Sequence, residues 1–362
     1  MAPKFHQLSI REVRRETPEC VSVSFDVPAD LQEAYTWQAG QYLTLNAEIN
    51  GEQVRRSYSI CTAPFENDLR VAVKLVPAGK FSTFANETLK RGDQLEVMTP
   101  TGNFTSPAIE DKSRRYVAFA AGSGITPILS LIKSILHDEP HSVVTLFYGN
   151  RTVESIMFRE ALDALKNTYI GRLSVHHLLS RESLGHELFN GRIDEARTAR
   201  FCGSLFDPAT VDLFLLCGPE QMIHAVKSVL EDNGVPDQRI RYELFTTPSS
   251  AQREVVKTES ATHDFDPDRE SQVTIRLDGN SFQVQIPFGG QSILDAALAS
   301  GADLPFACKG GVCCTCRAKL LEGEADMDVN YALEPEEVEN GFILTCQSHP
   351  RSDALVVDFD VS

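Results

Sequence analysis

Four cysteines near the C-terminus have the spacing of an electron-transfer centre. Cys308, Cys313 and Cys316 follow the pattern C-x4-C-x2-C, and 29 residues separate Cys316 from Cys346. Thiolates at this spacing hold [2Fe–2S] clusters of the plant type. Such a cluster carries one electron at a time and performs no substrate chemistry of its own. The rest of the chain must therefore supply electrons to it or remove them.

Two glycines inside this cysteine loop favour a cluster. Gly310 and Gly311 let the backbone pass close to sulfur atoms and direct amide N–H groups at them, which raises the reduction potential of a cluster. A structural zinc site is the alternative, but zinc sites usually combine two C-x2-C pairs, and this segment has one. Cys314 is out of register with the other four cysteines; it is a small buried residue, a spare ligand or an oxidation-sensitive thiol.

A short motif in the first third of the chain combines groups that suit a flavin. Arg56, Tyr58 and Ser59, in the run RSYS, offer a guanidinium for a pyrophosphate, a ring for the flat isoalloxazine and a hydroxyl for a ring nitrogen. The alternative is that Tyr58 serves packing and Arg56 is a surface charge. Ser82 lies in GKFST, at the start of a predicted helix. A helix N-terminus binds phosphate, although a plain N-cap would explain the same residues.

A glycine-rich loop marks a second binding site. Gly122, Gly124 and Thr126 lie in GSGITP, directly after a short buried strand and at the start of a helical pattern. A loop in this position binds the pyrophosphate of a dinucleotide, although Pro127 replaces the third glycine of the usual pattern. Cys217, in CGP, ends a later strand at the edge where open α/β sheets bind ligands. The alternative for Cys217 is a small buried hydrophobic residue.

Hydrophobic periodicity divides the chain into domains that must position these groups. Up to about residue 106, short alternating strands such as 21–27 and 69–76 are separated by turns, which predicts an antiparallel β-barrel. Residues 107–245 alternate strands with helices, which predicts a parallel sheet with helices on both faces. Residues 246–272 are polar and predict a linker, and residues 273–362 begin with a hairpin. The predicted strands of the second segment are 116–121, 143–148, 173–179 and 212–217. One predicted helix follows the first strand and ends near residue 137, and two others cover 158–166 and 221–233.

Composition narrows the class of protein. The 362 residues are 42% hydrophobic and 23% charged, as in a globular protein. No apolar run approaches the ~20 residues of a membrane helix, and the N-terminus lacks the apolar core of a signal peptide. We therefore expect a cytoplasmic protein. A net charge of −17 argues against binding nucleic acid.

The negative charge is concentrated in the last quarter of the chain. Residues 271–362 contain 14 Asp and Glu against 5 Lys and Arg. This excess forms either a solvated surface or a docking face for a positively charged redox partner. Nine cysteines, of which four have iron–sulfur spacing, suit a reducing compartment better than a disulfide scaffold.

In this order, RSYS, GSGITP, CGPEQM and the cysteine spacing resemble the ferredoxin–NADP+ reductase family, in the arrangement with a plant-type ferredoxin domain at the C-terminus. The resemblance covers essentially the whole chain. Within the family, runs such as LFYGNR, SILDAA and LPFACKGGVC are most similar to the reductase subunits of bacterial phenylacetyl-CoA 1,2-epoxidases. The resemblance implies four segments: an FAD-binding β-barrel (1–106), an NAD(P)-binding α/β domain (107–245), the linker (246–272) and an α+β ferredoxin domain of the β-grasp type (273–362).

The resemblance also implies a role for each candidate residue. Tyr58 would lie against the flavin ring, and Ser59 near its N5 atom. Cys217 would lie beside the reacting atoms of flavin and nicotinamide. Glu243 and Phe245 lie where the reductase module ends, and such residues usually close over the flavin. The remaining implied contacts are Arg56 and Ser82 with FAD; Gly122, Gly124 and Thr126 with the nicotinamide nucleotide; and Cys308, Cys313, Cys316 and Cys346 with iron.

The implied activity is transfer of electrons from NADPH through FAD and the cluster to an oxygenase, with the epoxidase as the expected partner. Ser180 and Arg181 resemble the stretch that binds the 2′-phosphate of NADPH, so we expect NADPH rather than NADH. The residues themselves suit either FAD or FMN, and the resemblance implies FAD. A Rieske-type or another di-iron oxygenase is the alternative partner. An iron–sulfur sensor without turnover is a second alternative, against which the intact RSYS and CGPEQM motifs argue.

Overall fold

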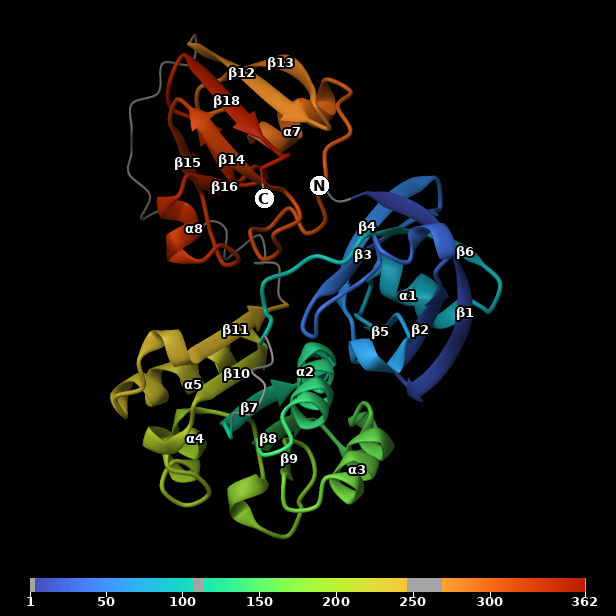
Figure 1. Cartoon of the computed structure of the whole chain (residues 1–362), viewed down its shortest axis with the longest axis vertical. Helices are drawn as coiled ribbons and strands as arrows, with labels where there is room; N and C mark the ends of the chain where they lie inside the picture. Colours follow the sequence, from blue (N-terminus) through green and yellow to red (C-terminus); the bar gives the residue numbers. More distant parts are fainter. Residues whose placement is uncertain (1–3, 107–112, 246–268, 362) are drawn as a thin grey trace. The chain divides into compact units, whose positions relative to one another are not determined.

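The computed structural model describes residues 4–106, 113–245 and 269–361. Its contacts divide the chain into two compact units. One comprises His6–Val54 and Tyr58–Phe245, and the other includes the C-terminal residues. The first unit contains a curled antiparallel sheet and a parallel sheet, and the second contains a mixed sheet (Figure 1).

The flavin part of the first unit is a six-stranded antiparallel sheet in the order β4-β3-β6-β1-β2-β5. A bridge between Ile60 and Val71 pairs the end of β4 with β5, so the two edges of the sheet meet. Asn50 and Gly51 both have positive φ, 54° and 77°, and form the tight turn that connects β3 to β4. The elements are β1 (Phe5–Thr17), β2 (Cys20–Asp26), β3 (Tyr42–Ile49), β4 (Glu52–Ser59), β5 (Arg70–Lys74), α1 (Lys80–Glu87) and β6 (Gln94–Met98).

The nucleotide part is a five-stranded parallel sheet in the order β11-β10-β7-β8-β9. The chain proceeds from β7 through β8 to β9 and then returns to the other side of β7, so the strand order reverses between β7 and β10. Ligands bind at such a reversal point in open α/β sheets. The elements are β7 (Arg115–Ala121), α2 (Ile125–Asp138), β8 (Val143–Asn150), α3 (Arg159–Thr168), β9 (Leu173–Leu179), α4 (Glu195–Phe201), β10 (Leu213–Gly218), α5 (Glu220–Asp232) and β11 (Ile240–Leu244).

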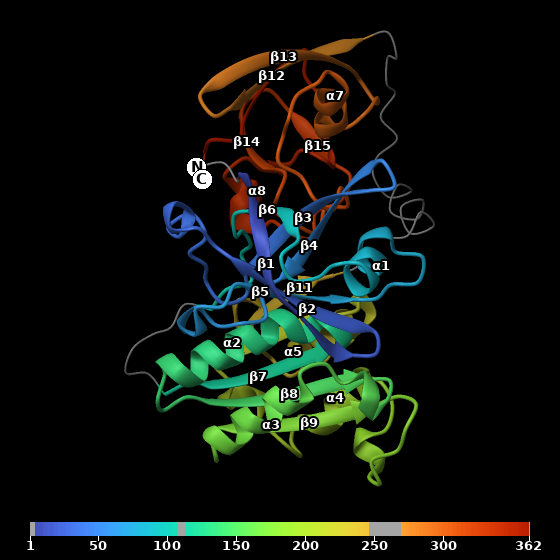
Figure 2. The same ribbon diagram turned by 90° about the vertical axis from the view of Figure 1, so that its right-hand side faces the viewer.

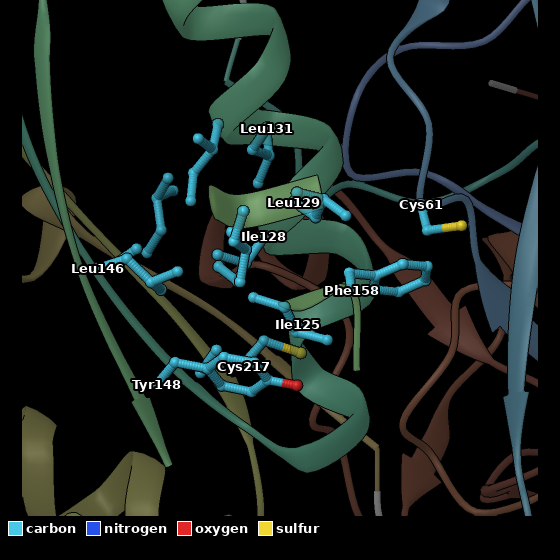
Figure 3. Close-up of a cluster of buried hydrophobic side chains, with 14 of the residues drawn as sticks. Cys61, Ile125, Ile128, Leu129, Leu131, Leu146, Tyr148, Phe158 and Cys217 are labelled. Carbon is cyan, nitrogen blue, oxygen red and sulfur yellow. The ribbon is translucent and has the colours of Figure 1, made fainter. Parts of the chain in front are cut away.

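Helices cover both faces of this sheet (Figure 2). On one face, α2 contributes Ile125, Ile128 and Leu129 to a core that also contains Leu146 and Tyr148 of β8 (Figure 3). On the other face, stacked aromatic rings form the core, with ring centroids of Phe147 and Phe201 4.4 Å apart. The residues of the first core are 7% exposed or less, which places α2, the helix after the glycine-rich loop, firmly against the sheet.

The C-terminal unit has a mixed five-stranded sheet in the order β13-β12-β18-β14-β16 and a separate pair, β15 and β17. β12 and β13 form a hairpin, and β12 pairs with β18 in parallel. Asp278 and Gly279 have positive φ, as the predicted two-residue turn requires. The elements are β12 (Glu270–Leu277), β13 (Asn280–Pro287), α7 (Ile293–Ala299), β14 (Arg317–Glu322), β15 (Ala325–Met327), α8 (Pro335–Glu339), β16 (Phe342–Leu344), β17 (Ser348–Pro350) and β18 (Ala354–Asp358).

These three sheets confirm the predicted fold class. The predicted linker, 246–272, lies mostly outside the described residues, and its last three residues belong to β12. No helix among the described residues is both long and apolar enough to cross a bilayer.

Candidate functional site

The residues expected to hold the flavin come from one strand. β4 carries Arg56, Tyr58 and Ser59 over its last four positions. The Arg56 side chain is exposed, Tyr58 is half-buried and Ser59 is buried. The ring of Tyr58 lies 5.6 Å, centroid to centroid, from the ring of Phe81 on α1. Strand and helix therefore combine an aromatic surface, an accessible cation and a hydroxyl, and these groups fit a flavin.

Ser82 lies in the first turn of α1 and is buried. Its hydroxyl accepts a hydrogen bond from the Val76 amide (3.1 Å) and donates one to the Gly79 carbonyl (3.1 Å). These bonds fix the loop that leads into the helix. Because the first turn of a helix leaves amide N–H groups without intrahelical acceptors, this end of α1 can receive a pyrophosphate. The contribution of Ser82 to that site is the shape of the loop.

The glycine-rich loop forms a single turn of 3-10 helix, Gly122–Gly124, between β7 and α2. Gly122 has φ 55°, a conformation that favours glycine. The Thr126 hydroxyl donates to the Ser123 carbonyl (2.9 Å), and the Tyr148 hydroxyl donates to the Gly122 carbonyl (3.1 Å). The loop is thus held from within and from β8, with the start of α2 available for an anion.

Gly124 is required by a close approach of two backbone segments. A Cβ atom at this position would lie 2.1 Å from the Cys217 carbonyl oxygen and 2.8 Å from the Gly218 nitrogen. The start of α2 therefore packs directly on the end of β10, and Figure 3 shows Ile125 and Cys217 together at that end of the helix. This contact brings the two sequence motifs, GSGITP and CGPEQM, into one site.

The three candidate catalytic residues converge from three strands. The Ser59 hydroxyl donates to Glu243 Oε2 at 3.2 Å. Cys217 of β10 and Glu243 of β11 are directly opposite each other in the parallel pair. Strands β4, β10 and β11 therefore bring these three candidate residues together at one place.

Burial determines the charges of Glu243 and Cys217. Removal from water raises the pKa of Glu243 to about 8, and the hydrogen bond from Ser59 acts in the opposite direction. Burial, and secondarily the Glu243 carboxyl, raise the pKa of the Cys217 thiol well above its ordinary value. At neutral pH the site therefore contains a neutral thiol and a mostly neutral carboxylic acid, so no fixed negative charge opposes the arrival of a hydride.

This assignment predicts a pH dependence for flavin reduction. As pH rises through about 8, Glu243 ionises and its carboxylate opposes the charge that reduction places nearby, so the rate of flavin reduction should fall. Glu243→Gln should remove this step between about pH 7 and 9.5, which stopped-flow absorbance would measure. Retention of the wild-type profile by the variant would contradict the assignment.

The free energy of unfolding should also depend on pH through Glu243. Because the folded-state pKa of Glu243 exceeds its ordinary value of 4.5, the folded protein binds more protons than the unfolded chain between these values. The contribution of this group to the free energy of unfolding therefore declines as pH rises from about 4.5 to about 8.

Lys74 is a site residue that the sequence reasoning missed. A Cβ at Gly122 would lie 3.7 Å from Lys74 Nζ, so an ammonium from β5 of the flavin sheet reaches the nucleotide loop. A cation there can neutralise a phosphate bound by the loop. In the sequence Lys74 is only the last residue of an alternating strand, and nothing local distinguishes it.

The predicted contacts with the 2′-phosphate of the nucleotide follow β9, whereas the glycine-rich loop follows β7. Ser180 and Arg181 follow β9 and are exposed. The Arg181 amide donates to the Arg151 carbonyl (2.9 Å), which places a second exposed arginine beside the first. The neighbouring Glu182 carboxylate accepts from the Val153 amide (2.9 Å). Two exposed arginines are thus backbone neighbours, and the carboxylate of the adjacent Glu182 is bound to the backbone.

Phe245 ends the described part of the module, directly after β11, and is 36% exposed. It lies two residues beyond Glu243 on the same segment. Its expected position over the flavin stays a prediction.

In the C-terminal unit, the four expected iron ligands form two pairs. Thiol contacts join Cys308 to Cys313 and Cys316 to Cys346, and Cys313 also influences Cys316 electrostatically. A [2Fe–2S] cluster takes two thiolates on each of two irons. Among the described residues, no three His, Cys, Asp or Glu side chains converge as ligands of a single metal ion. The paired arrangement therefore fits a two-iron cluster better than a mononuclear site.

The cysteine loop also directs amides at sulfur. The Gly310 N–H donates to Cys308 Sγ at 3.3 Å. A hydrogen bond from Cys313 and backbone amides of the loop lower the pKa of Cys308 to about 6, which favours the thiolate that binds iron. Cys314 differs: its Sγ donates to the Ala332 carbonyl at 3.2 Å.

Three family models match the chain. An oxidoreductase FAD-binding domain matches residues 7–106, an oxidoreductase NAD-binding domain matches 119–228, and a 2Fe-2S iron-sulfur cluster binding domain matches 275–351. The chain therefore binds FAD, a nicotinamide nucleotide and a [2Fe–2S] cluster.

Relatives match over the full length. One component of the 1,2-phenylacetyl-CoA epoxidase of Escherichia coli is 43% identical over 98% of both chains. The ferredoxin reductase component of 3-ketosteroid-9-alpha-monooxygenase from Rhodococcus rhodochrous is 32% identical over 97% of this chain and 96% of its own. The structure of phthalate dioxygenase reductase shares the fold, with a TM-score of 0.57 and 23% identity over 98% of both chains. The chain thus belongs to the family of FAD- and [2Fe–2S]-containing reductase components that pass electrons to the oxygenase component of a multicomponent oxygenase.

Proposed function

We propose that this reductase transfers electrons from NADPH to a phenylacetyl-CoA epoxidase. The observation that carries the electron path is the convergence of Ser59, Cys217 and Glu243 with the start of α2. The partner assignment rests on the 43% identity over 98% of the chain and of its relative. When bound, FAD would supply the exchange between two-electron hydride chemistry at the nicotinamide and one-electron transfer to the iron–sulfur cluster.

The chain's own residues bind and orient the reactants. Tyr58 supports the ring of the flavin, and Ser59 places a hydroxyl at the reacting edge while it holds Glu243. The glycine-rich loop before α2 shapes the anion site for the nucleotide's pyrophosphate through Gly122, Gly124 and Thr126. The ammonium group of Lys74 neutralises the charge of that pyrophosphate.

The cysteine ligands complete the electron path. Cys308, Cys313, Cys316 and Cys346 would hold the cluster, with Cys308 beside Cys313 and Cys316 beside Cys346. Cys314 is no ligand in this assignment, because its thiol is directed at a carbonyl.

Arg181 and Arg151 favour NADPH over NADH. Arg181→Ala should raise the Kd for NADPH by about 10- to 100-fold, the effect of one charge-assisted hydrogen bond, and leave that for NADH nearly unchanged. Arg200→Ala, which changes an exposed arginine of α4, is the matched control. An equal loss of affinity for both nucleotides would overturn the assignment of the 2′-phosphate site.

The nucleotide and the electron path can be tested together. Anaerobic titration with NADPH and, separately, NADH should bleach both flavin and iron–sulfur absorbance, and NADPH should do so at lower concentration. Bleaching with NADH alone would keep the electron path and contradict the nucleotide assignment. Absence of bleaching with either would contradict the path itself.

The partner requires a reconstituted assay. The purified reductase should support NADPH-dependent turnover of a phenylacetyl-CoA epoxidase at a rate well above that with a Rieske-type oxygenase, while reducing a small one-electron acceptor equally well in both mixtures. The 32% identical relative from a 3-ketosteroid monooxygenase makes an oxygenase of another class the second candidate partner. Faster turnover with the Rieske-type enzyme would favour that candidate.

A further inference from the structure

The side chain of Gln347 joins the two segments that carry the first and fourth predicted iron ligands. Its Nε2 lies 3.1 Å from the Lys309 carbonyl oxygen, 2.9 Å from the Cys346 carbonyl oxygen and 3.6 Å from Cys346 Sγ. Lys309 directly follows Cys308. A single amide group therefore contacts the cysteine loop, the backbone of the fourth cysteine and its sulfur.

The position of this side chain is fixed by its surroundings. The backbone amide of Gln347 donates to the Leu344 carbonyl (2.8 Å), and its backbone carbonyl accepts from the Asp328 amide (2.9 Å). Gly311, with φ 74°, lies against it: a Cβ at 311 would come within 3.3 Å of Gln347 Cγ and 3.0 Å of the Val329 carbonyl. Gly311 thus leaves the space that the glutamine occupies.

Gln347 also supports an unusual backbone conformation. Lys309 has φ 51°, a strained conformation for a residue with a side chain, so neighbouring contacts must maintain it. The bond from Gln347 holds its carbonyl, and the ion pair of Lys309 Nζ with Asp295 (2.7 Å) holds its side chain. This turn directs the Gly310 N–H at Cys308 Sγ.

The N–H donors of Gly310 and Gln347 both act on the reduction potential of the cluster. Reduction of a cluster held here would increase the negative charge on its sulfur ligands, and N–H donors to these sulfurs would stabilise the reduced form. The Gly310 donor belongs to the backbone and is independent of residue type. The Gln347 donor belongs to a side chain, so the sequence at this position can adjust the potential.

We propose that Gln347 raises the reduction potential of the cluster, by donating to Cys346 Sγ and by holding the Lys309 turn that directs the Gly310 amide at Cys308. This inference rests on the proposed ligation by the four cysteines. It assigns to Gln347 a positioning and tuning role in the transfer from flavin to cluster.

The test uses the full-length holoprotein with Gln347→Leu and Gln347→Glu. In a redox titration followed by electron paramagnetic resonance, Gln347→Leu should lower the equilibrium constant for cluster reduction about tenfold, equivalent to about 59 mV for one electron. Gln347→Glu should lower it further, because a carboxylate replaces the donor. The flavin potential, measured in the same titration, should not change.

Gln283→Leu is the matched control, since this exposed glutamine of β13 accepts a hydrogen bond from the exposed Gln272 of β12 (2.9 Å). It should keep the wild-type potential. A wild-type cluster potential in both Gln347 variants would overturn the inference and leave the proposed function intact. If Gln347→Leu loses iron, Gln347→Asn, which retains a shorter donor, should give an intermediate potential; the wild-type value there would also overturn it. A wild-type protein without a cluster signal would refute the proposed function instead.

Discussion

Cys346→Ala should leave reduction of the flavin by NADPH unchanged and abolish delivery of electrons beyond it. Cys346 is the single predicted ligand from outside the cysteine loop, and it pairs with Cys316. Changes in groups that merely contact metal ligands alter metal affinity by about 10- to 100-fold. Loss of a ligand should therefore reduce cluster occupancy and the rate of oxygenase reduction by more than about 100-fold.

Iron content, the visible spectrum and stopped-flow flavin reduction would separate these effects. Cys314→Ala is the matched control, because its thiol donates to the Ala332 carbonyl. It should retain full iron and full transfer. Iron loss in Cys314→Ala with full iron in Cys346→Ala would refute the assigned ligand set.

Gly124→Ala should slow hydride transfer by about 100-fold. The added Cβ would lie 2.1 Å from the Cys217 carbonyl oxygen, so α2 and its nucleotide loop would have to move away from β10. A displacement of about 1 Å is enough to reduce a hydride-transfer rate by about 100-fold. Overpacking should also lower the free energy of unfolding by about 1–3 kcal/mol.

Gly149→Ala is the control for this prediction. Gly149 lies at the end of β8 in the same sheet, and a Cβ there would meet Ile193 Cδ1 at 3.4 Å, a flexible side chain that can adjust. Its rate of flavin reduction, measured by stopped flow with saturating NADPH, should stay near that of the wild type. A normal rate in Gly124→Ala would show that the contact with β10 does not set the position of the nucleotide.

The parallel sheet shows where local sequence was sufficient. The predicted strand 173–179 coincides with β9, and the predicted helix 221–233 differs from α5 by one residue at each end. The helix α5 was predictable because an amphipathic helix has a strong periodicity, with its faces meeting core and solvent at regular intervals. The α4 helix and the β11 strand were not predicted. α4 has only seven residues, and β11 is an edge strand that alternates poorly and is defined by its pairing with β10.

The sequence alone determined the chemistry that this protein can perform. The types and spacing of its cysteines, the RSYS motif and the two nucleotide motifs are local, because backbone and side chains within a few residues of one another must bind a single group. Only the tertiary structure decided which of these groups meet. Ser59 and Glu243 are bonded across two domains, Lys74 of one sheet reaches the loop of another, and Gln347 joins Cys346 to the cysteine loop. Such contacts depend on how strands pack, and periodicity within a strand does not specify its distant neighbours.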